Sequence, residues 1–301
     1  MTFRQLQAFL ALVRERSFSR AAGRIHLSQP TLSQHIRELE RELGKRLFTR
    51  RGREAGLTEA GRVFQPYALR VTTAAEDGRQ AVSHLDGLRH GSLVIGAGTT
   101  PGIYLLPRVV AVFQRRYPNI QLTLHIANSG VIEQRVRDGD VDLGVVGGHV
   151  LGPGERCVAA GLMDELLLIT GRAHRWARRR YVGRAELAAE RLLVREAGSA
   201  TRQVMERALQ QAGIVPSSTM ELNHTEAIKE CVMAGLGVAF VSTYAVRSEV
   251  RRREVAVIRV RGLRIRRHFH VIHAEGRSLP ASGRAFLAVL GEEAPRLGAL
   301  R

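Results

Sequence analysis

The hydrophobic pattern of this 301-residue chain changes period once, and that change constrains the fold more than any other feature. Residues 1–57 are dense in short helical patterns, and residues 58–88 have the pattern of one long helix. From Ser92 onward, short β-rich runs alternate with helices, which is typical of parallel strands joined by right-handed crossovers. Gly87 and the stretch 89–91 mark the boundary. The sequence therefore predicts an all-α part, a long helix and an α/β part.

Composition narrows the class of protein. Hydrophobic residues make up 45% and charged residues 25%, as in soluble globular proteins, and no stretch approaches the roughly 18 apolar residues of a membrane span. The N-terminus lacks the pattern of a signal peptide, so we expect a cytoplasmic protein. The net charge of +18 favours a polyanionic partner, nucleic acid first, although 44 of the 46 basic residues are arginine, which a GC-rich coding bias would also produce.

Two short helices with a tight connection are expected between residues 19 and 44. Ser19 can cap the first, Ser28 can cap the second, and Pro30 suits the first turn of that second helix. Gly44 ends it. An ordinary amphipathic surface helix has the same periodicity, so periodicity alone leaves both interpretations open. The apolar stripe is Leu32, Ile36, Leu39 and Leu43, and the polar face, suited to base edges and phosphates, is Thr31, Ser33, Gln34, Arg37 and Arg41.

Six motifs in the first sixty residues carry a resemblance: SFSRAA at 17–22, LSQPTLS at 27–33, IRELE at 36–40, LG at 43–44, LF at 47–48 and LTEAG at 57–61. Residues 3–61 resemble the N-terminal domain of the LysR-type transcriptional regulators. The resemblance implies a winged helix-turn-helix over 1–57, a recognition helix that begins near Gln29 and enters the major groove, and a wing at 48–57. The implied DNA-binding residues are Ser28, Gln29, Pro30, Thr31, Ser33, Gln34 and Arg37 in the helix and Arg50, Arg51 and Arg53 in the wing.

Residues 58–90 are predicted to form a linker helix that pairs two chains. Pro66 is expected to kink or break this helix near its start, and a helix packed on its own domain is the alternative. The resemblance implies a homodimer on double-stranded DNA with an inverted-repeat operator, and a homotetramer as a dimer of dimers. Apolar residues from Ala60 onward alternate in steps of four and three, as in a coiled-coil seam, and the predicted dimerisation residues are Phe64, Tyr67, Val71, Ala74, Gly78, Ala81 and Leu85.

The third region carries further motifs: LLP at 105–107, Phe113, YP at 117–118, GDVDLG at 139–144 and GLGVAF at 235–240. Residues 91–301 resemble the effector-binding domain of the same family, itself similar to periplasmic solute-binding proteins. The resemblance implies two subdomains joined by two crossovers, with the effector in the cleft between them. We place the first subdomain at 91–160 and 268–301 and the second at 161–267.

Helix N-termini with hydroxyl neighbours are natural anion sites, so we expect an anionic metabolite in the cleft and no cofactor. Arg202 could add a bidentate clamp for a carboxylate or another oxyanion. Ordinary helix capping is the alternative for the hydroxyl pairs. The predicted effector-binding residues are Thr99, Thr100, Pro101, Ser199, Ala200, Thr201, Arg202, His224 and Thr225, with Ser129, Gly147 and Gly148 at the rim.

Other constellations are weaker. His268 and His270 share a strand face from which His273 points away, so no metal site is predicted, and Cys157 and Cys231 lie far apart in sequence. Because motifs of common catalytic sites are missing, we expect no enzyme. The sequence predicts a DNA-binding transcriptional regulator controlled by a small anionic metabolite, with RNA polymerase as a candidate partner and no membrane partner. The alternatives are an architectural DNA-binding protein with a vestigial pocket, and a ligand-binding protein or enzyme with a DNA-binding head.

Overall fold

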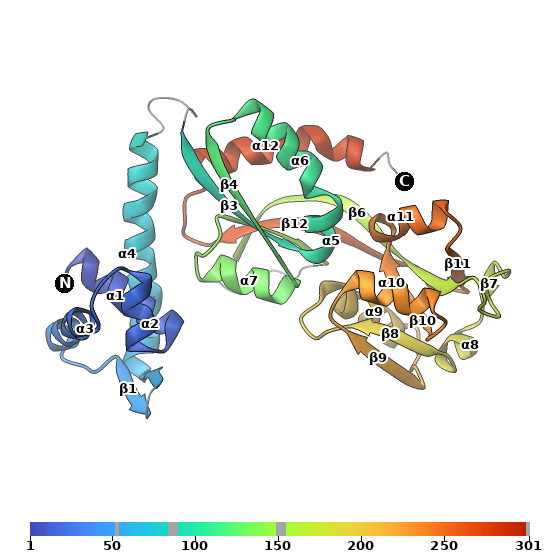
Figure 1. Ribbon diagram of the computed structural model, residues 1–301, viewed down its shortest axis with the longest axis horizontal. Coiled ribbons are helices and arrows are strands. Elements are labelled where there is room, and N and C mark those ends of the chain that lie inside the picture. Colours follow the sequence, from blue (N-terminus) through green and yellow to red (C-terminus); the bar gives the residue numbers. More distant parts are fainter. Residues whose placement is uncertain (52–53, 84–89, 149–154, 299–301) are drawn as a thin grey trace. The chain divides into compact units, whose positions relative to one another are not determined.

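The computed structural model describes residues 1–51, 54–83, 90–148 and 155–298. The chain divides into two compact units, one built mainly from Met1–Leu85 and the other from Asp86–Glu275 and Leu279–Arg301 (Figure 1). Each unit is described by itself below. No helix in the described ranges is long and apolar enough to cross a membrane.

The first unit is a winged helix-turn-helix followed by a long helix. Its core packs Leu32, Ile36 and Leu39 of the third helix against Leu6 and Phe9 of the first. The two short strands pair antiparallel as the wing. This part of the predicted architecture is confirmed. The elements are α1 (Phe3–Glu15), α2 (Phe18–Arg24), α3 (Gln29–Leu43), β1 (Phe48–Arg51), β2 (Glu54–Leu57) and α4 (Glu59–Ser83).

Local signals set both ends of α3 as predicted. The Ser28 hydroxyl accepts the backbone N–H of Thr31 at 3.3 Å, and Gly44 adopts a left-handed φ of 63°. Two details of the prediction are wrong. Helix α2 begins earlier than expected, with Ser17 at the cap, and the Ser19 hydroxyl instead donates to Gln29. Leu43 is 38% exposed because it stands in the last turn, beyond the core.

Replacing Ser28 with alanine is expected to destabilise the head by about 1 kcal/mol, because the first turn of α3 loses its side-chain acceptor. Urea unfolding of the DNA-free protein, followed by helical circular dichroism, measures this loss. Ser33→Ala is the matched control, since it removes a hydroxyl from the interior of the same helix, where alanine is the better helix former. Equal losses for the two variants would contradict the capping role.

Helix α4 runs through Pro66 without a break, so the expected interruption does not occur. Phe64 packs edge-on against Phe9 of the head, with ring centroids 5.2 Å apart, so the start of the predicted seam belongs partly to the head core. Further along, Tyr67 and Val71 are 54% and 48% exposed. The exposed part of the seam therefore begins after Phe64. Leu85 and the side chain of Ala81 lie outside the described residues.

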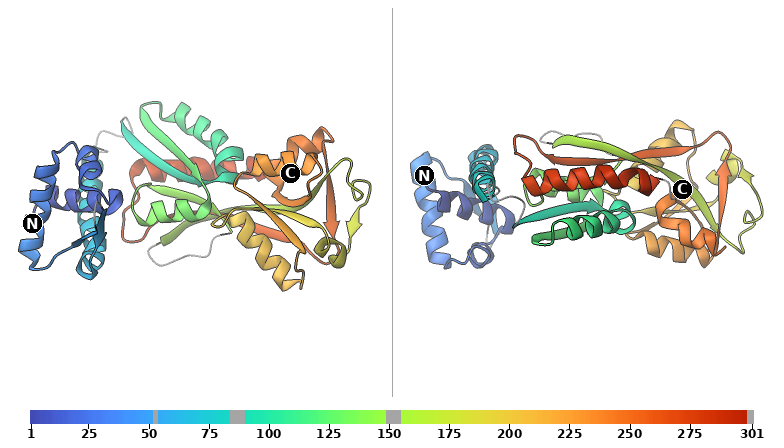
Figure 2. Two further views of the ribbon diagram at one scale, coloured as in Figure 1. Left: turned by 60° about the horizontal axis from the view of Figure 1, so that its bottom comes forward. Right: turned by 90° about the horizontal axis from the view of Figure 1, so that it is seen from above.

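The second unit is built on a mixed sheet with the strand order β4-β3-β5-β12-β6-β10-β8-β9. In the first subdomain, β3 pairs in parallel with β4 and β5. Helices α6 and α12 lie side by side on one face, where Arg116 pairs with Glu292, and α7 covers the other face (Figure 2). The elements are β3 (Gly91–Gly98), α5 (Thr99–Tyr104), α6 (Leu106–Arg116), β4 (Ile120–Ala127), α7 (Ser129–Arg137), β5 (Leu143–Gly147) and α12 (Ala281–Gly298).

The second subdomain repeats this plan around its own cores. Strand β8 pairs in parallel with β9 and β10. Trp176, the single tryptophan, is buried in an apolar core of this subdomain. The elements are β7 (Tyr181–Val182), α8 (Arg184–Ala188), β8 (Arg191–Arg195), α9 (Ala200–Gln211), β9 (Ser218–Leu222), α10 (Thr225–Met233), β10 (Val238–Ser242), α11 (Thr243–Arg251) and β11 (Val255–Val260).

Two long antiparallel strands, β6 (Glu155–Gly171) and β12 (Ile265–Ala274), join the subdomains. Strand β12 pairs with β5 of the first subdomain, and β6 pairs with β10 and β11 of the second. The pairing places Arg267 directly opposite Asp164. The predicted architecture of two subdomains with two crossovers is therefore confirmed, and any change in subdomain angle must bend these two strands.

Candidate functional site

A small polar pocket lies between the two subdomains, where α5, α7 and α9 begin. Helix N-termini present backbone N–H groups and positive partial charge, so three of them around one pocket favour an anion. Eight of the predicted effector-binding residues meet here: Thr99, Thr100, Pro101, Ser129, Gly147, Ser199, Ala200 and Thr201. The remaining lining residues, which sequence reasoning missed, are Gly98, Asn128, Arg195, Arg267 and Phe269.

Arg195 ends strand β8, and its side chain is only 4% exposed. Its Nε and Nη2 hold the Glu196 carboxylate at 2.7 and 3.0 Å. Its Nη1 donates to Thr225 at 2.8 Å, and Nη2 donates to Thr99 of the first subdomain at 3.3 Å. The guanidinium therefore spans the cleft, and the long contact to Thr99 is the weakest of its bonds.

Arg267 brings a second buried guanidinium to the same pocket from β12. Its Nε donates to Asp164 at 2.8 Å, and the two side chains are 2% and 0% exposed. Nη1 donates to Thr201 of the second subdomain at 2.9 Å, and Nη2 donates to Thr100 of the first at 3.2 Å. Because Asp164 and Arg267 stand on the two crossing strands, this ion pair connects the pocket directly to the hinge.

The cleft is closed, because polar groups of the two subdomains form hydrogen bonds with each other across it. The pocket holds about 10 Å³, roughly the space of one water molecule. Besides the arginine contacts, the N–H of Gly130 donates to the carbonyl of Gly198 at 3.1 Å, which joins the start of α7 to the loop before α9. The Tyr104 hydroxyl donates to Glu226 of the second subdomain, and burial together with this carboxylate raises the pKa of Tyr104 above its usual range. A metabolite can enter only if some of these contacts open.

Four predicted residues lie outside the pocket lining. Arg202 is turned toward carboxylates of its own subdomain, with Nε donating to Glu206 at 2.7 Å and Nη1 donating to Glu221 at 2.5 Å. His224 is exposed and caps α10, and Thr225 accepts the hydrogen bond from Arg195. The N–H of Gly148 donates to the carbonyl of His268 at 2.8 Å. The helix cap beside Ser129 is Asn128, whose side chain accepts from Val131.

The predicted DNA-binding helix presents a polar face in the head. Gln29, Pro30, Gln34 and Arg37 are exposed, and Ser33 is half-exposed. Within the described residues, Arg37 has no carboxylate at ion-pair distance. Arg50 and Arg51 belong to β1, but their side chains, and all of Arg53, lie outside the described part of the chain.

Gln34 is already engaged on this face. Its Nε2 donates to Glu38 at 3.0 Å, and hydrogen bonds from Gln34 and Gln5 lower the pKa of that carboxyl. Gln34 must release Glu38 to reach a base edge, whereas the Arg37 guanidinium is free to reach a phosphate or a guanine. The face therefore has the side-chain chemistry of a recognition helix.

Within the described ranges, the histidines and cysteines form no comparable site. His268 is exposed, Phe269 is buried and His270 is half-buried, so the predicted alternation holds over these residues, and His273 is buried. No cluster of three potential metal-binding side chains forms in the residues that the structure describes. Cys157 contacts His270 at 3.9 Å, far from Cys231 in sequence.

Comparison with known protein families matches both units. Residues 3–62 match the bacterial regulatory helix-turn-helix proteins of the lysR family, and residues 86–295 match the LysR substrate binding domain. The RuBisCO operon transcriptional regulator of Allochromatium vinosum is 34% identical over 298 residues, which cover 99% of this chain and 98% of that protein.

Two solved structures have the same fold as this chain over the parts that align. A full-length OxyR variant from Pseudomonas aeruginosa aligns with a TM-score of 0.77 at 23% identity, covering 96% of this chain and 94% of that one, and shows the same fold. The regulatory domain of Synechocystis PCC6803 CcmR, solved in complex with 2-PG, aligns with a TM-score of 0.61 at 26% identity and covers 70% of this chain and 97% of that one. The chain belongs to the LysR family of DNA-binding transcriptional regulators.

Proposed function

We propose that this regulator binds its operator under the control of a small anionic metabolite held in the cleft. The observation that carries the proposal is the pocket where two buried guanidinium groups, Arg195 and Arg267, meet the N-termini of three helices. Such a site offers several N–H donors and positive charge with little access for water, which suits a carboxylate or a phosphate. The 2-PG held by the related CcmR domain makes 2-PG the first ligand to test.

The ligand would act by shifting the closed cleft toward a second conformation. Since the closed pocket holds about one water, an anion must displace the bonds that Thr99 and Thr100 make to the two arginines. An anionic ligand oxygen that replaces these hydroxyls makes a hydrogen bond between two charged groups, in place of one between a guanidinium and a neutral hydroxyl. Binding thereby favours the state that accommodates the anion, and the Asp164–Arg267 pair passes the change to β6 and β12.

The exposed apolar positions of α4 support pairing of two chains. Val63, Tyr67 and Val71 are 62%, 54% and 48% exposed, and a second copy of α4 would cover them. We propose a dimer that addresses an inverted repeat in double-stranded DNA, and a tetramer formed from two such dimers. In this role the chain acts in the cytoplasm, has no enzymatic activity, and has RNA polymerase as a candidate partner.

Operator binding tests the head. We expect Gln34→Ala and Arg37→Ala each to weaken affinity for the cognate operator by about 1–3 kcal/mol, because each removes a base or phosphate contact in the major groove. Fluorescence anisotropy with a labelled operator at fixed salt measures the effect. Arg115→Ala removes one exposed positive charge from α6 and serves as the control for net charge. Unchanged affinity for both head variants would remove these residues from the interface.

A further inference from the structure

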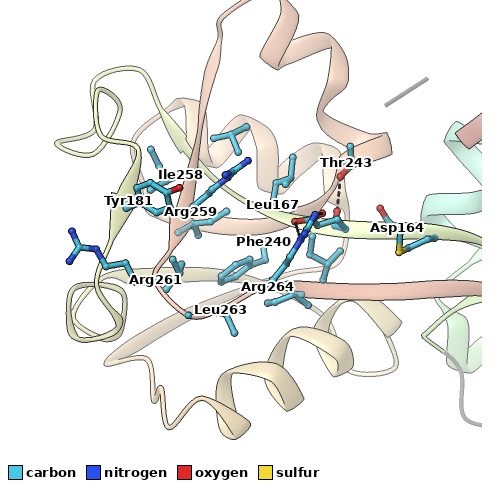
Figure 3. Close-up of a pocket in the computed structure, with 18 of the residues that line it drawn as sticks. Asp164, Leu167, Tyr181, Phe240, Thr243, Ile258, Arg259, Arg261, Leu263 and Arg264 are labelled. Carbon is cyan, nitrogen blue, oxygen red and sulfur yellow. Dashed lines mark hydrogen bonds and ion pairs between the residues drawn. The ribbon is translucent and has the colours of Figure 1, made fainter. Parts of the chain in front are cut away.

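A second, larger cavity lies inside the second subdomain, away from the cleft. It measures about 570 Å³, within the size range of small-molecule sites. Figure 3 shows it between β6, β11 and the turn that leads into β12. None of the predicted effector-binding residues lines it.

The cavity arises from a local departure of the chain from strand β6. Ile258 of β11 pairs with Leu168, and Ile265 of β12 pairs with Leu166, so β11 and β12 follow the same edge of β6 in succession. Between these two pairs, β6 contains one residue, Leu167, whereas the segment that connects β11 to β12 contains the six residues 259–264. This excess length cannot lie along β6, and the excursion leaves a hollow beside Leu167.

The excursion is held in place by backbone hydrogen bonds. The N–H of Arg261 donates to Val182 at 3.0 Å, and the N–H of Leu263 donates to Val260 at 3.1 Å. Gly262 turns the chain with a φ of 71°. Because these contacts fix the loop to β7 and close it on itself, the hollow is part of the folded subdomain and exists before a ligand arrives.

The walls and the rim of the cavity differ in chemistry. The walls include the buried side chains of Leu168, Phe240 and Ile258, which belong to the core of the subdomain. The exposed rim carries Arg259, Arg264 and Tyr181, and Figure 3 shows Arg259 and Arg264 beside the hollow, while Arg261 extends away from it. An apolar interior with a cationic rim fits an amphipathic anion.

The charge of this rim is only partly balanced. Glu165 accepts from Arg264 at 2.9 and 2.8 Å, and this bond lowers the pKa of the Glu165 carboxyl. Within the described residues, no carboxylate lies at ion-pair distance from Arg259. Arg259 is instead the register partner of Tyr181 across β11 and β7, and Arg259 lowers the pKa of Tyr181. Arg259 is thus a cation that a ligand can reach.

We infer that this cavity binds a small monocarboxylic acid with an apolar body, at a site separate from that of the anion in the cleft. The apolar body lies against Leu168, Phe240 and Ile258, and the carboxylate meets Arg259 and the Tyr181 hydroxyl at the rim. The cavity is built on β6 and the start of β12, the strands that carry Asp164 and Arg267. A ligand bound here would therefore affect the conformation of the hinge strands from a second site.

Calorimetric titration of the full-length protein with octanoate and with 3-phenylpropionate tests the inference. We expect at least one of these acids to bind, and octanol and acetate, which lack the charge and the apolar body respectively, to bind at least about tenfold more weakly. Arg259→Met, which keeps an apolar stem, should weaken binding of the acid by about tenfold. Arg266→Met removes an exposed charge from β12 outside the lining and should leave the affinity within about twofold.

A cavity-filling variant gives a second, independent readout. Leu263→Trp places a large side chain at the rim of the hollow and should abolish binding of the acid without changing the sedimentation mass. The inference is overturned if neither acid binds, if octanol binds as well as octanoate, or if Arg259→Met retains the parent affinity. It is also overturned if Leu263→Trp changes the mass in the absence of ligand, since the hollow would then be an interface between copies of the chain.

Discussion

Replacing Arg195 with methionine is expected to remove the response to the effector while the protein still binds its operator. The substitution keeps the apolar stem but deletes the guanidinium that spans the cleft between Thr99 and Thr225. Losing one partner of a buried, charged hydrogen bond costs about 2–5 kcal/mol, or roughly 30- to 5000-fold in affinity for the anion. Calorimetric titration with the effector measures the loss, and operator anisotropy without effector checks the head.

The matched control for this experiment is Arg202→Met. Arg202 lies seven residues away and does not itself line the pocket: its guanidinium pairs with Glu206 and Glu221, and it also donates to the backbone carbonyl of Arg195 at 3.0 Å, which Arg195→Met leaves in place. We expect this variant to keep the anion affinity of the parent within about threefold, since it removes mainly surface ion pairs. If Arg202→Met loses the response and Arg195→Met keeps it, the clamp is the arginine that the sequence indicated, and the pocket described above is not the anion site.

Removing the partner of the other buried arginine is expected to cost about 3–5 kcal/mol of folding free energy, because Asp164→Ala leaves the Arg267 guanidinium buried without a counter-charge. Asp164 is 1% exposed, holds Arg267 at 2.8 Å, and accepts from Ser242 at 2.8 Å. Urea unfolding followed by the fluorescence of Trp176 reports on this unit, since the single tryptophan is 1% exposed in its core.

A double variant separates two contributions to the lost folding free energy: the loss of the ion pair itself and the cost of leaving one charge buried without a partner. In Asp164→Leu with Arg267→Met, both charges are replaced by apolar side chains, and we expect most of the lost stability to return. The same protein should bind the anion weakly, because Arg267 is gone from the pocket. A double variant as unstable as Asp164→Ala would mean that the hydrogen bonds of the pair, rather than charge balance, hold the hinge.

Much of the head could be predicted because its determinants are local. Ser28, Pro30 and Gly44 mark the ends of α3 within a few residues, and Leu32, Ile36 and Leu39 give its buried face. Where two residues satisfy the same local rule, the prediction from sequence was wrong. Ser17 and Ser19 could both cap α2, and only the tertiary contact between Ser19 and Gln29 distinguishes them.

The cleft could be predicted only in part. Hydroxyl residues at helix starts, such as Thr99, Thr100 and Thr201, are visible as strand-to-helix junctions, and the structure brings them together. Arg267 is different, since its burial depends on a register that pairs it with Asp164, 103 residues away. Arg195 has a weak local signal, an arginine that ends the apolar run of β8. A charged residue at the end of a buried strand is therefore the feature to look for.

The most direct test of a cleft controlled by an anion is a thermal unfolding screen of the full-length protein and Arg195→Met. The ligands are small carboxylates, phosphates, sulfate and neutral analogues at one ionic strength. At about a hundred times its dissociation constant, a true ligand adds ~2.7 kcal/mol, or roughly 5–10 °C for a unit of this size. We predict that one class of anion gives this shift in the parent and not in Arg195→Met. An equal shift from a neutral analogue, or an equal shift in the variant, would contradict the account.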